Sequence, residues 1–197
     1  MSDLELRHYE TKSIEVRADG EGMNISGYAI VFDEPSKPLY GGMFVETISK
    51  RALQGVDLAD LFLLYNHNDN DILGSTVGNT MSVSVDERGL RFDASLPNTQ
   101  LGKDTFELIK RGDIRGVSFG FMVESDTWNT SVTPEHRTIN KIKEVKELSI
   151  TAFPAYDQTE VSARAINFIE TCKDCKIDIN TQEANYLLKQ VQKNEHK

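Results

Sequence analysis

MSVSVDERGLRFDASL, residues 81–96, decides the broad fold class, because two runs of alternating apolar and polar residues flank a short polar turn. Alternation with a period of two is typical of a strand with one buried face. The turn, DERG at residues 86–89, ends in a glycine and joins the runs as a hairpin connection does. This stretch therefore predicts an antiparallel β-hairpin.

Most of residues 1–164 resembles the hairpin in pattern, with apolar runs separated by Gly- and Pro-containing turns. The expected strands lie within residues 12–17, 23–35, 38–48, 60–69, 116–125 and 137–153. Two helices are expected in this region, a short one over residues 49–57 and a longer one over residues 98–114. From residue 165 the pattern becomes helical and amphipathic, which predicts a β-rich domain over 1–164 and a helical tail over 165–197.

Charge and composition narrow the range of partners and compartments. The formal net charge is −9, and all of the excess lies in residues 1–164, which argues against nucleic acid or an anionic membrane as a partner. The chain contains no run of 18 apolar residues and begins with a polar segment, so neither a membrane span nor a secretion signal is expected. The two cysteines, Cys172 and Cys175, favour a reducing compartment over a disulfide framework.

Ser118 is the candidate nucleophile, in DIRGVSFGF at residues 113–121. If the segment is a strand, Gly116 and Gly120 share the face of Ser118, and room is left beside the hydroxyl for a peptide. The other interpretation is a structural strand serine at a place where neighbouring elements pack closely.

A nucleophilic serine needs a base, and His67 is the best placed of the four histidines, which are His8, His67, His136 and His196. It follows the apolar strand that ends in NHND, and a strand end combines a defined position with access to solvent. The alternative for His67 is an ordinary surface-loop histidine.

Glu147 is the candidate acid that would orient the base. Strand alternation places it on one face with Val145 and Ser149, beside a strongly apolar run, where a lone carboxylate is costly and an imidazolium would be a suitable partner. Alternatively, Glu147 belongs to a solvated charge pattern, KEVKE.

The sequence predicts no metal and no cofactor. Residues 69–80 match three positions of a calcium-binding loop but place Leu73 where an oxygen ligand is needed and Thr80 where an acidic ligand is needed. Cys172, Cys175 and His196 supply only three of the four ligands that a structural zinc site requires.

The chain resembles the prohead (procapsid) maturation proteases of tailed bacteriophages. The resemblance covers roughly residues 10–165 and rests on four stretches in the family's order, GYAIVFDE (27–34), LLYNHND (63–69), FELIKRGDIRGVSFGF (106–121) and VKELSITAFPAYDQTEV (145–161). Within the last two stretches, the segments RGDIRGVSFGF (111–121) and ELSITAFPAY (147–156), taken together, are the most specific.

The resemblance implies a serine endopeptidase with the fold of the herpesvirus assembly proteases (assemblins), a closed antiparallel β-barrel surrounded by helices. It implies that Ser118 is the nucleophile, His67 the base and Glu147 the third member of a triad. It also implies substrates among capsid or scaffold segments and the protease itself, a dimer, and a place inside the immature procapsid in the cytoplasm of a bacterial host.

Catalysis by such a triad also needs donors for the oxyanion. We expect them from the backbone N–H groups around Phe119 and Gly120, with Arg115 acting directly or through water. Two other functions fit the residues: a non-catalytic β-barrel that assists capsid assembly or scaffolding, and a small metal-binding module. Self-cleavage by the wild type but not by S118A would distinguish the protease from both.

Overall fold

The computed structural model describes residues 4–9, 14–17 and 22–152. The chain divides into two units, Met1–Ala155 and Tyr156–Lys197, and all of the described residues lie in the first. The predicted helical tail and its boundary at residues 164 and 165 lie outside the described residues, as do Cys172, Cys175 and His196.

Ten strands and one helix make up the described part of the chain. They are β1 (Leu4–Tyr9), β2 (Glu15–Arg17), β3 (Asn24–Val31), β4 (Phe44–Ile48), β5 (Phe62–Tyr65), β6 (Asn68–Ser75), β7 (Met81–Val85), β8 (Gly89–Ser95), α1 (Gln100–Arg111), β9 (Gly116–Asn129) and β10 (Glu135–Thr151).

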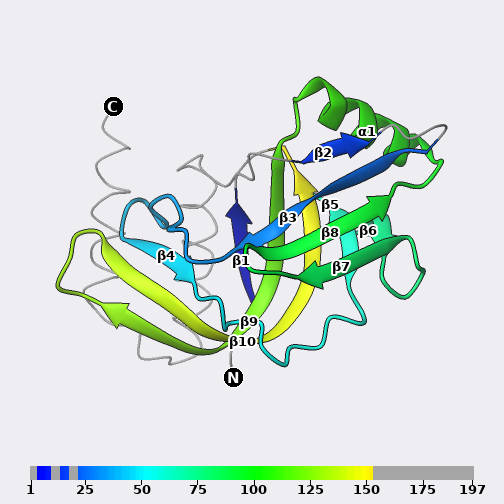
Figure 1. Ribbon diagram of the computed structural model, residues 1–197. Coiled ribbons are helices and arrows are strands. Elements are labelled where there is room, and N and C mark those ends of the chain that lie inside the picture. The colour runs from blue at the N-terminus through cyan, green and yellow to red at the C-terminus, as the bar shows by residue number, and fades with distance from the viewer. Residues whose placement is uncertain (1–3, 10–13, 18–21, 153–197) are drawn as a thin grey trace, which may run out of the picture. The chain divides into compact units, whose positions relative to one another are not determined.

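The strands form two sheets (Figure 1). One sheet has the order β2-β3-β8-β7, and all of its pairs are antiparallel. The other has the order β1-β9-β10-β5-β6, with β4 as a branch on β10. Both β4 and β5 run parallel to β10, β4 beside its first part and β5 beside its last part. The second sheet is therefore mixed, and it carries all of the candidate catalytic residues.

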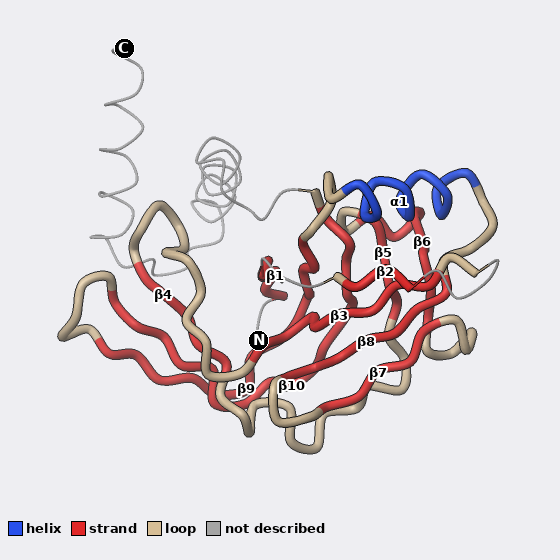
Figure 2. Tube along the Cα trace, turned by 45° about the horizontal axis from the view of Figure 1, so that its top comes forward, coloured by secondary structure: helices blue, strands red, loops and turns tan. Residues whose placement is uncertain are grey.

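The prediction of a closed antiparallel barrel surrounded by helices was wrong. The larger sheet is an open half-barrel whose path ends at β1 and at β6, and α1 is the one helix of the described chain (Figure 2). The sheet stays open because its end strands in the described part of the chain, β1 and β6, pair with different neighbours and not with each other, and it branches where β4 and β5 both pair with β10. The four strands β2, β3, β7 and β8 pair among themselves in a separate sheet.

Two elements with strong local sequence patterns, a hairpin and a helix, were predicted correctly. The hairpin expected at residues 81–96 is β7 and β8, and the Asp86 side chain accepts hydrogen bonds from the backbone of the turn. The helix expected at residues 98–114 is α1, which begins after Thr99, whose side chain caps it, and ends at Gly112 in the left-handed conformation.

The short helix expected at residues 49–57 was wrong. The segment forms consecutive turns, whose backbone bonds join residues three apart, as from Ala52 N–H to Ser49 O and from Gln54 N–H to Arg51 O. Gly55 has a φ of 78° and ends the turns. A nine-residue segment gains too little from helix propagation to offset nucleation, so its tertiary contacts decide its form.

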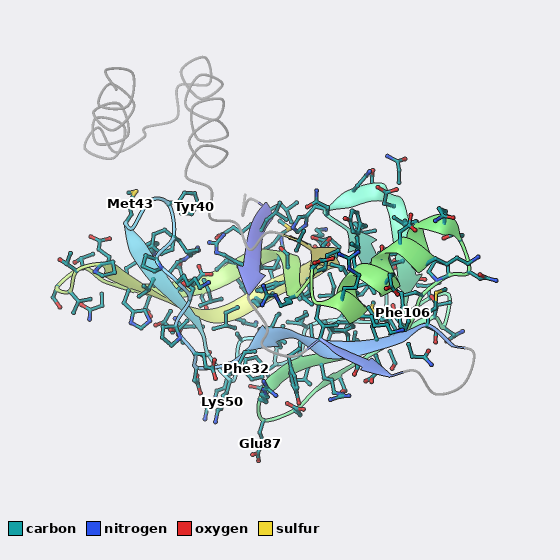
Figure 3. The ribbon with its side chains drawn as sticks, turned by 90° about the horizontal axis from the view of Figure 1, so that it is seen from above. Phe32, Tyr40, Met43, Lys50, Glu87 and Phe106 are labelled. Atoms are coloured by element: carbon teal, nitrogen blue, oxygen red, sulfur yellow. The ribbon has the colours of Figure 1, made fainter. Side chains whose placement is uncertain are left out.

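β9 and β10 are the longest strands and form a curved ribbon through the larger sheet (Figure 1). On one face of this ribbon, Val117, Phe119 and Phe121 of β9 join Leu148 and Ile150 of β10 in the hydrophobic core. Figure 3 shows Tyr40 and Met43 on the loop before β4, at the opposite end of the unit from Phe106 of α1. No helix within the described ranges has the length and hydrophobicity of a membrane span.

Candidate active site

His67 lies in the two-residue turn between β5 and β6, and not on the strand itself. Asn66 and His67 have φ values of 51° and 59°, and Tyr65 pairs with Asn68 across the turn. Positive φ at both central residues is the requirement of a type I′ hairpin turn. Asn and His adopt this conformation more often than most other residues, but it remains uncommon outside glycine, and such backbone strain is concentrated at functional sites. The turn is held against β10 by the bond from Asn66 N–H to Ile150 O, 2.9 Å long.

The His67 ring contacts Glu147 directly. His67 Nδ1 lies 2.8 Å from Glu147 Oε1, and the two side chains are 16% and 14% exposed. An ionised carboxylate only accepts hydrogen bonds, so Nδ1 carries the hydrogen of this bond. His136, by contrast, lies at the other end of β10, where Nε2 is 2.8 Å from Thr47 Oγ1. The structure therefore brings together two of the three residues proposed for a triad, 80 residues apart in sequence.

A β-bulge decides the direction of the Glu147 side chain. The register between β9 and β10 shifts between Val145 and Glu147, so regular alternation breaks there. Val145 is consequently in the core with Leu148 and Ile150, whereas Glu147 is half-buried on the other face. The expectation that Val145 and Glu147 share a face was wrong for this reason.

Ser149 completes the surroundings of this pair. Its hydroxyl donates to Glu147 Oε2 at 2.5 Å and accepts from the backbone N–H of His67 at 3.1 Å. It thereby holds the carboxylate and the strained turn at once, leaving Glu147 Oε1 for the His67 ring. Our sequence analysis gave Ser149 no role, although its place two residues after Glu147 on a strand is the signal that puts both on one face.

Ser118 lies in the middle of β9, next to this group. It pairs with Ser149 of β10, and its neighbour Gly120 pairs with Glu147. Directly opposed residues of antiparallel strands have side chains on the same face, with Cβ atoms about 4.5–5.5 Å apart. Ser118 is thus on the face that carries Ser149 and Glu147, but it is fully buried.

The Ser118 hydroxyl donates its hydrogen bond to the backbone oxygen of Arg7 in β1, at 2.8 Å. The space over Gly120, expected to admit a peptide, is already used. A Cβ atom at this position would lie 2.9 Å from Glu147 Oε1 and 3.2 Å from Leu6 Cδ2. The glycine therefore makes room for the Glu147 carboxylate and for β1.

The residues expected to stabilise an oxyanion differ in how accessible they are to a substrate. Phe119 and Gly120 are flanked on both sides, by Arg7 and Leu6 of β1 and by Leu148 and Glu147 of β10, so their backbone lies inside the ladder. Arg115 precedes β9 and its side chain is exposed.

A cluster of five charged side chains anchors β1 on the opposite face of the sheet. Arg7 donates to both oxygens of Glu46, at 2.7 and 3.1 Å, and Arg137 donates to both oxygens of Glu5, at 2.6 and 2.9 Å. Arg137 also bonds Glu46 at 3.0 Å and Asp126 at 2.6 Å, which joins the two pairs. Glu46 is fully buried, and no local pattern in the sequence indicated this cluster.

The charged cluster changes the pKa values of Glu5 and Arg7. Burial disfavours the charged form of Glu5, but the hydrogen bond from Arg137 and the charges of Arg7 and Arg137 outweigh it and hold the pKa of Glu5 below its ordinary value. Burial also opposes the charge of Arg7, and the carboxylate of Glu46 overcomes this and raises the pKa of Arg7. Both groups of β1 are therefore kept ionised.

Known proteins resemble this chain in sequence and in fold. The prohead protease of Enterobacteria phage HK97 is 27% identical over 168 residues, which are 84% of this chain and 71% of that protein. Among solved structures, the bacteriophage T4 capsid assembly protease aligns with a TM-score of 0.51 and 11% identity over 75% of this chain and 96% of its own, a likeness of fold alone. The family described as caudovirus prohead serine protease matches residues 8–174. Because this match spans most of the 197 residues, the chain belongs to the family of caudovirus prohead serine proteases.

Proposed function

We propose that this serine protease cleaves capsid or scaffold segments, and itself, with Ser118 as nucleophile, His67 as base and Glu147 as the orienting acid. The observation that carries the assignment is the 2.8 Å contact between His67 Nδ1 and Glu147 Oε1, beside the strand that bears Ser118. Since Glu147 holds Nδ1, the other ring nitrogen, Nε2, is the one that serves the nucleophile.

The reaction follows from these positions. His67 Nε2 takes the Ser118 Oγ proton while Oγ attacks the carbonyl carbon of the scissile peptide, forming a tetrahedral oxyanion. His67 then gives the proton to the leaving amine, the C–N bond breaks, and an acyl-enzyme remains. Water, deprotonated by His67, attacks the ester and frees the acid and Ser118. Glu147 stabilises the imidazolium in both halves.

The resting hydroxyl of Ser118 donates to Arg7 O, so the reaction requires it to turn to another staggered rotamer, toward His67. For the oxyanion we propose the guanidinium of Arg115 and, of the backbone N–H groups of Phe119 and Gly120, the one that points to the β1 edge, since the N–H groups of consecutive strand residues point to opposite edges. The exposed position of Arg115, just before β9, supports its approach to a bound substrate.

The names of the relatives support the choice of substrate and place. One is a prohead protease and another a capsid assembly protease, which fits action inside the procapsid on capsid or scaffold protein. The net charge of −9 supports partners other than nucleic acid or an anionic membrane. A dimer, the bacterial cytoplasm as compartment and the relation to herpesvirus proteases remain predictions.

The decisive experiment follows cleavage by mass spectrometry in full-length wild type, S118A and S26A, each alone and with a co-expressed capsid or scaffold protein. Ser26 is another buried strand serine, in β3, and serves as the matched control. We expect cleavage by wild type and S26A and none by S118A. Cleavage by S118A at the wild-type rate, or no cleavage by wild type with any partner, would overturn the proposal.

A further inference from the structure

β1 lies where a peptide substrate would have to lie. It is an edge strand, antiparallel to β9, and its residues Arg7 and His8 pair with Phe119 and Ser118. It brings a backbone carbonyl oxygen, that of Arg7, to 2.8 Å from the Ser118 hydroxyl oxygen. A serine protease needs such an approach of a main-chain carbonyl to its nucleophile.

We infer that the edge of β9 beside Ser118 is the surface on which an extended substrate peptide pairs, and that Leu4–Tyr9 occupies this edge as a built-in competitor. The inference rests on Ser118 being the nucleophile. Strand addition to an exposed sheet edge uses main-chain hydrogen bonds, which any extended segment can supply. The same edge therefore accepts either β1 or a substrate segment, but not both.

The contact of β1 with Ser118 is unproductive for cleavage. The hydroxyl donates its hydrogen to the Arg7 oxygen, whereas attack requires that hydrogen to go to His67 and a lone pair to face the carbonyl carbon. Ser118 is also fully buried, so an incoming peptide reaches it only after β1 has left the edge. β1 thus blocks the site without being consumed by it.

Charged groups of β1 hold this strand in place. Glu5 and Arg7 supply its bidentate bonds to Arg137 and Glu46, while the Leu4 side chain is 56% exposed. Bidentate charge-assisted bonds are strong and geometrically specific. A partner or an incoming segment that competes for Arg137 or Glu46 would therefore release β1. The edge of β9 can thus change from a state covered by β1 to a state open to substrate.

The test measures how fast a fluorophosphonate probe labels Ser118 in full-length variants. E5Q removes the charge of Glu5, which β1 contributes to Arg137, and keeps the shape of the side chain. D126N is the matched control, because Asp126 bonds the same Arg137 but belongs to β9 and not to β1. We expect labelling about tenfold faster in E5Q than in wild type, and D126N to remain near wild type.

A second arm removes residues 1–9 and adds the β1 segment alone back as the free peptide LELRHY, residues 4–9. We expect the shortened chain to be labelled faster than wild type and the peptide to slow its labelling competitively. The proposal that β1 competes with substrate would be refuted if E5Q, the shortened chain and wild type were labelled at equal rates while S118A stayed unlabelled. That result would leave the assignment of Ser118 as nucleophile intact. Labelling that persists in S118A would instead refute the nucleophile. If the shortened chain fails to give a thermal transition, E5Q against D126N decides the question.

Discussion

Gly120 offers a sharp test of how the site is built, because it lies opposite Glu147 in the ladder. The change is Gly120→Ala, one methyl group. The new Cβ atom would lie 2.9 Å from Glu147 Oε1, the same oxygen that accepts from His67 Nδ1. The contact cannot be relieved cheaply, because the other oxygen of this carboxylate is bonded to Ser149.

The size of the effect follows from the distances. To bring Oε1 from 2.9 Å to an ordinary contact of at least 3.4 Å, the carboxylate must move by about 0.5 Å. A displacement of that size away from His67 would stretch the 2.8 Å bond to about 3.3 Å, beyond the usual range. We expect kcat to fall about 10–100-fold, since small misplacements of catalytic groups have effects of this order. Overpacking should also lower the free energy of unfolding by about 1–3 kcal/mol.

The assay measures kcat and KM on a fluorogenic peptide that carries a mapped cleavage site, with a thermal melt of each protein. Gly74→Ala is the matched control, because Gly74 is also a strand glycine and its added Cβ would meet nothing closer than 3.5 Å. A G120A enzyme with the kcat of G74A and of wild type would show that Glu147 does not need its observed position. That result would refute the role of Glu147 as the orienting acid.

Three further predictions concern other parts of the site. S149A should lower kcat about tenfold by removing the hydroxyl that holds Glu147, and S149T should retain most of the activity, whereas equal kinetics of both variants and wild type would contradict the role of Ser149. R115A should lower kcat about 10²–10³-fold if the guanidinium binds the oxyanion, and unchanged turnover would remove Arg115 from the mechanism without affecting Ser118. Because the pKa of Glu5 lies below its ordinary value of 4.5, its ion pairs stabilise the docked β1 above that pH, and this stability is lost as the pH falls through the lowered pKa. Hydrogen–deuterium exchange of the β1 amides, corrected for intrinsic rates, should therefore rise on acidification in wild type and much less in E5Q.

Local chemistry was enough to predict several elements from the sequence. The β7–β8 hairpin and α1 were predicted because alternation, a turn ending in Gly89 and the helical pattern that ends at Gly112 act over a few residues. Strand parity also indicated that Ser118 and Gly120 share a face, as they do in β9. The family resemblance likewise rested on short stretches, and the match over residues 8–174 confirms it.

Long-range packing decided the rest. The register shift between Val145 and Glu147 sets the face of the carboxylate, and it arises where β10 pairs with β9, not from any signal within the strand. The type I′ turn that carries His67 is bonded to β10, more than 80 residues away in sequence. Asn66 donates to the backbone of β10, and Ser149 of β10 accepts from His67. The segment at residues 49–57 had helical residues but became turns for the same reason.

The identity of the site residues depends on local sequence, whereas their arrangement in space depends on long-range pairing. Residue types, their spacing along a strand and the caps of a helix are properties of neighbouring residues, so the sequence by itself determined that Ser118, His67 and Glu147 were candidates. The openness of the sheet depends on which strands pair, and so does the position of β1 over Ser118, whose bond to Arg7 spans 111 residues. Such pairings are chosen by the total free energy of packing and by loop closure, which no short stretch encodes, and only the tertiary structure decided them.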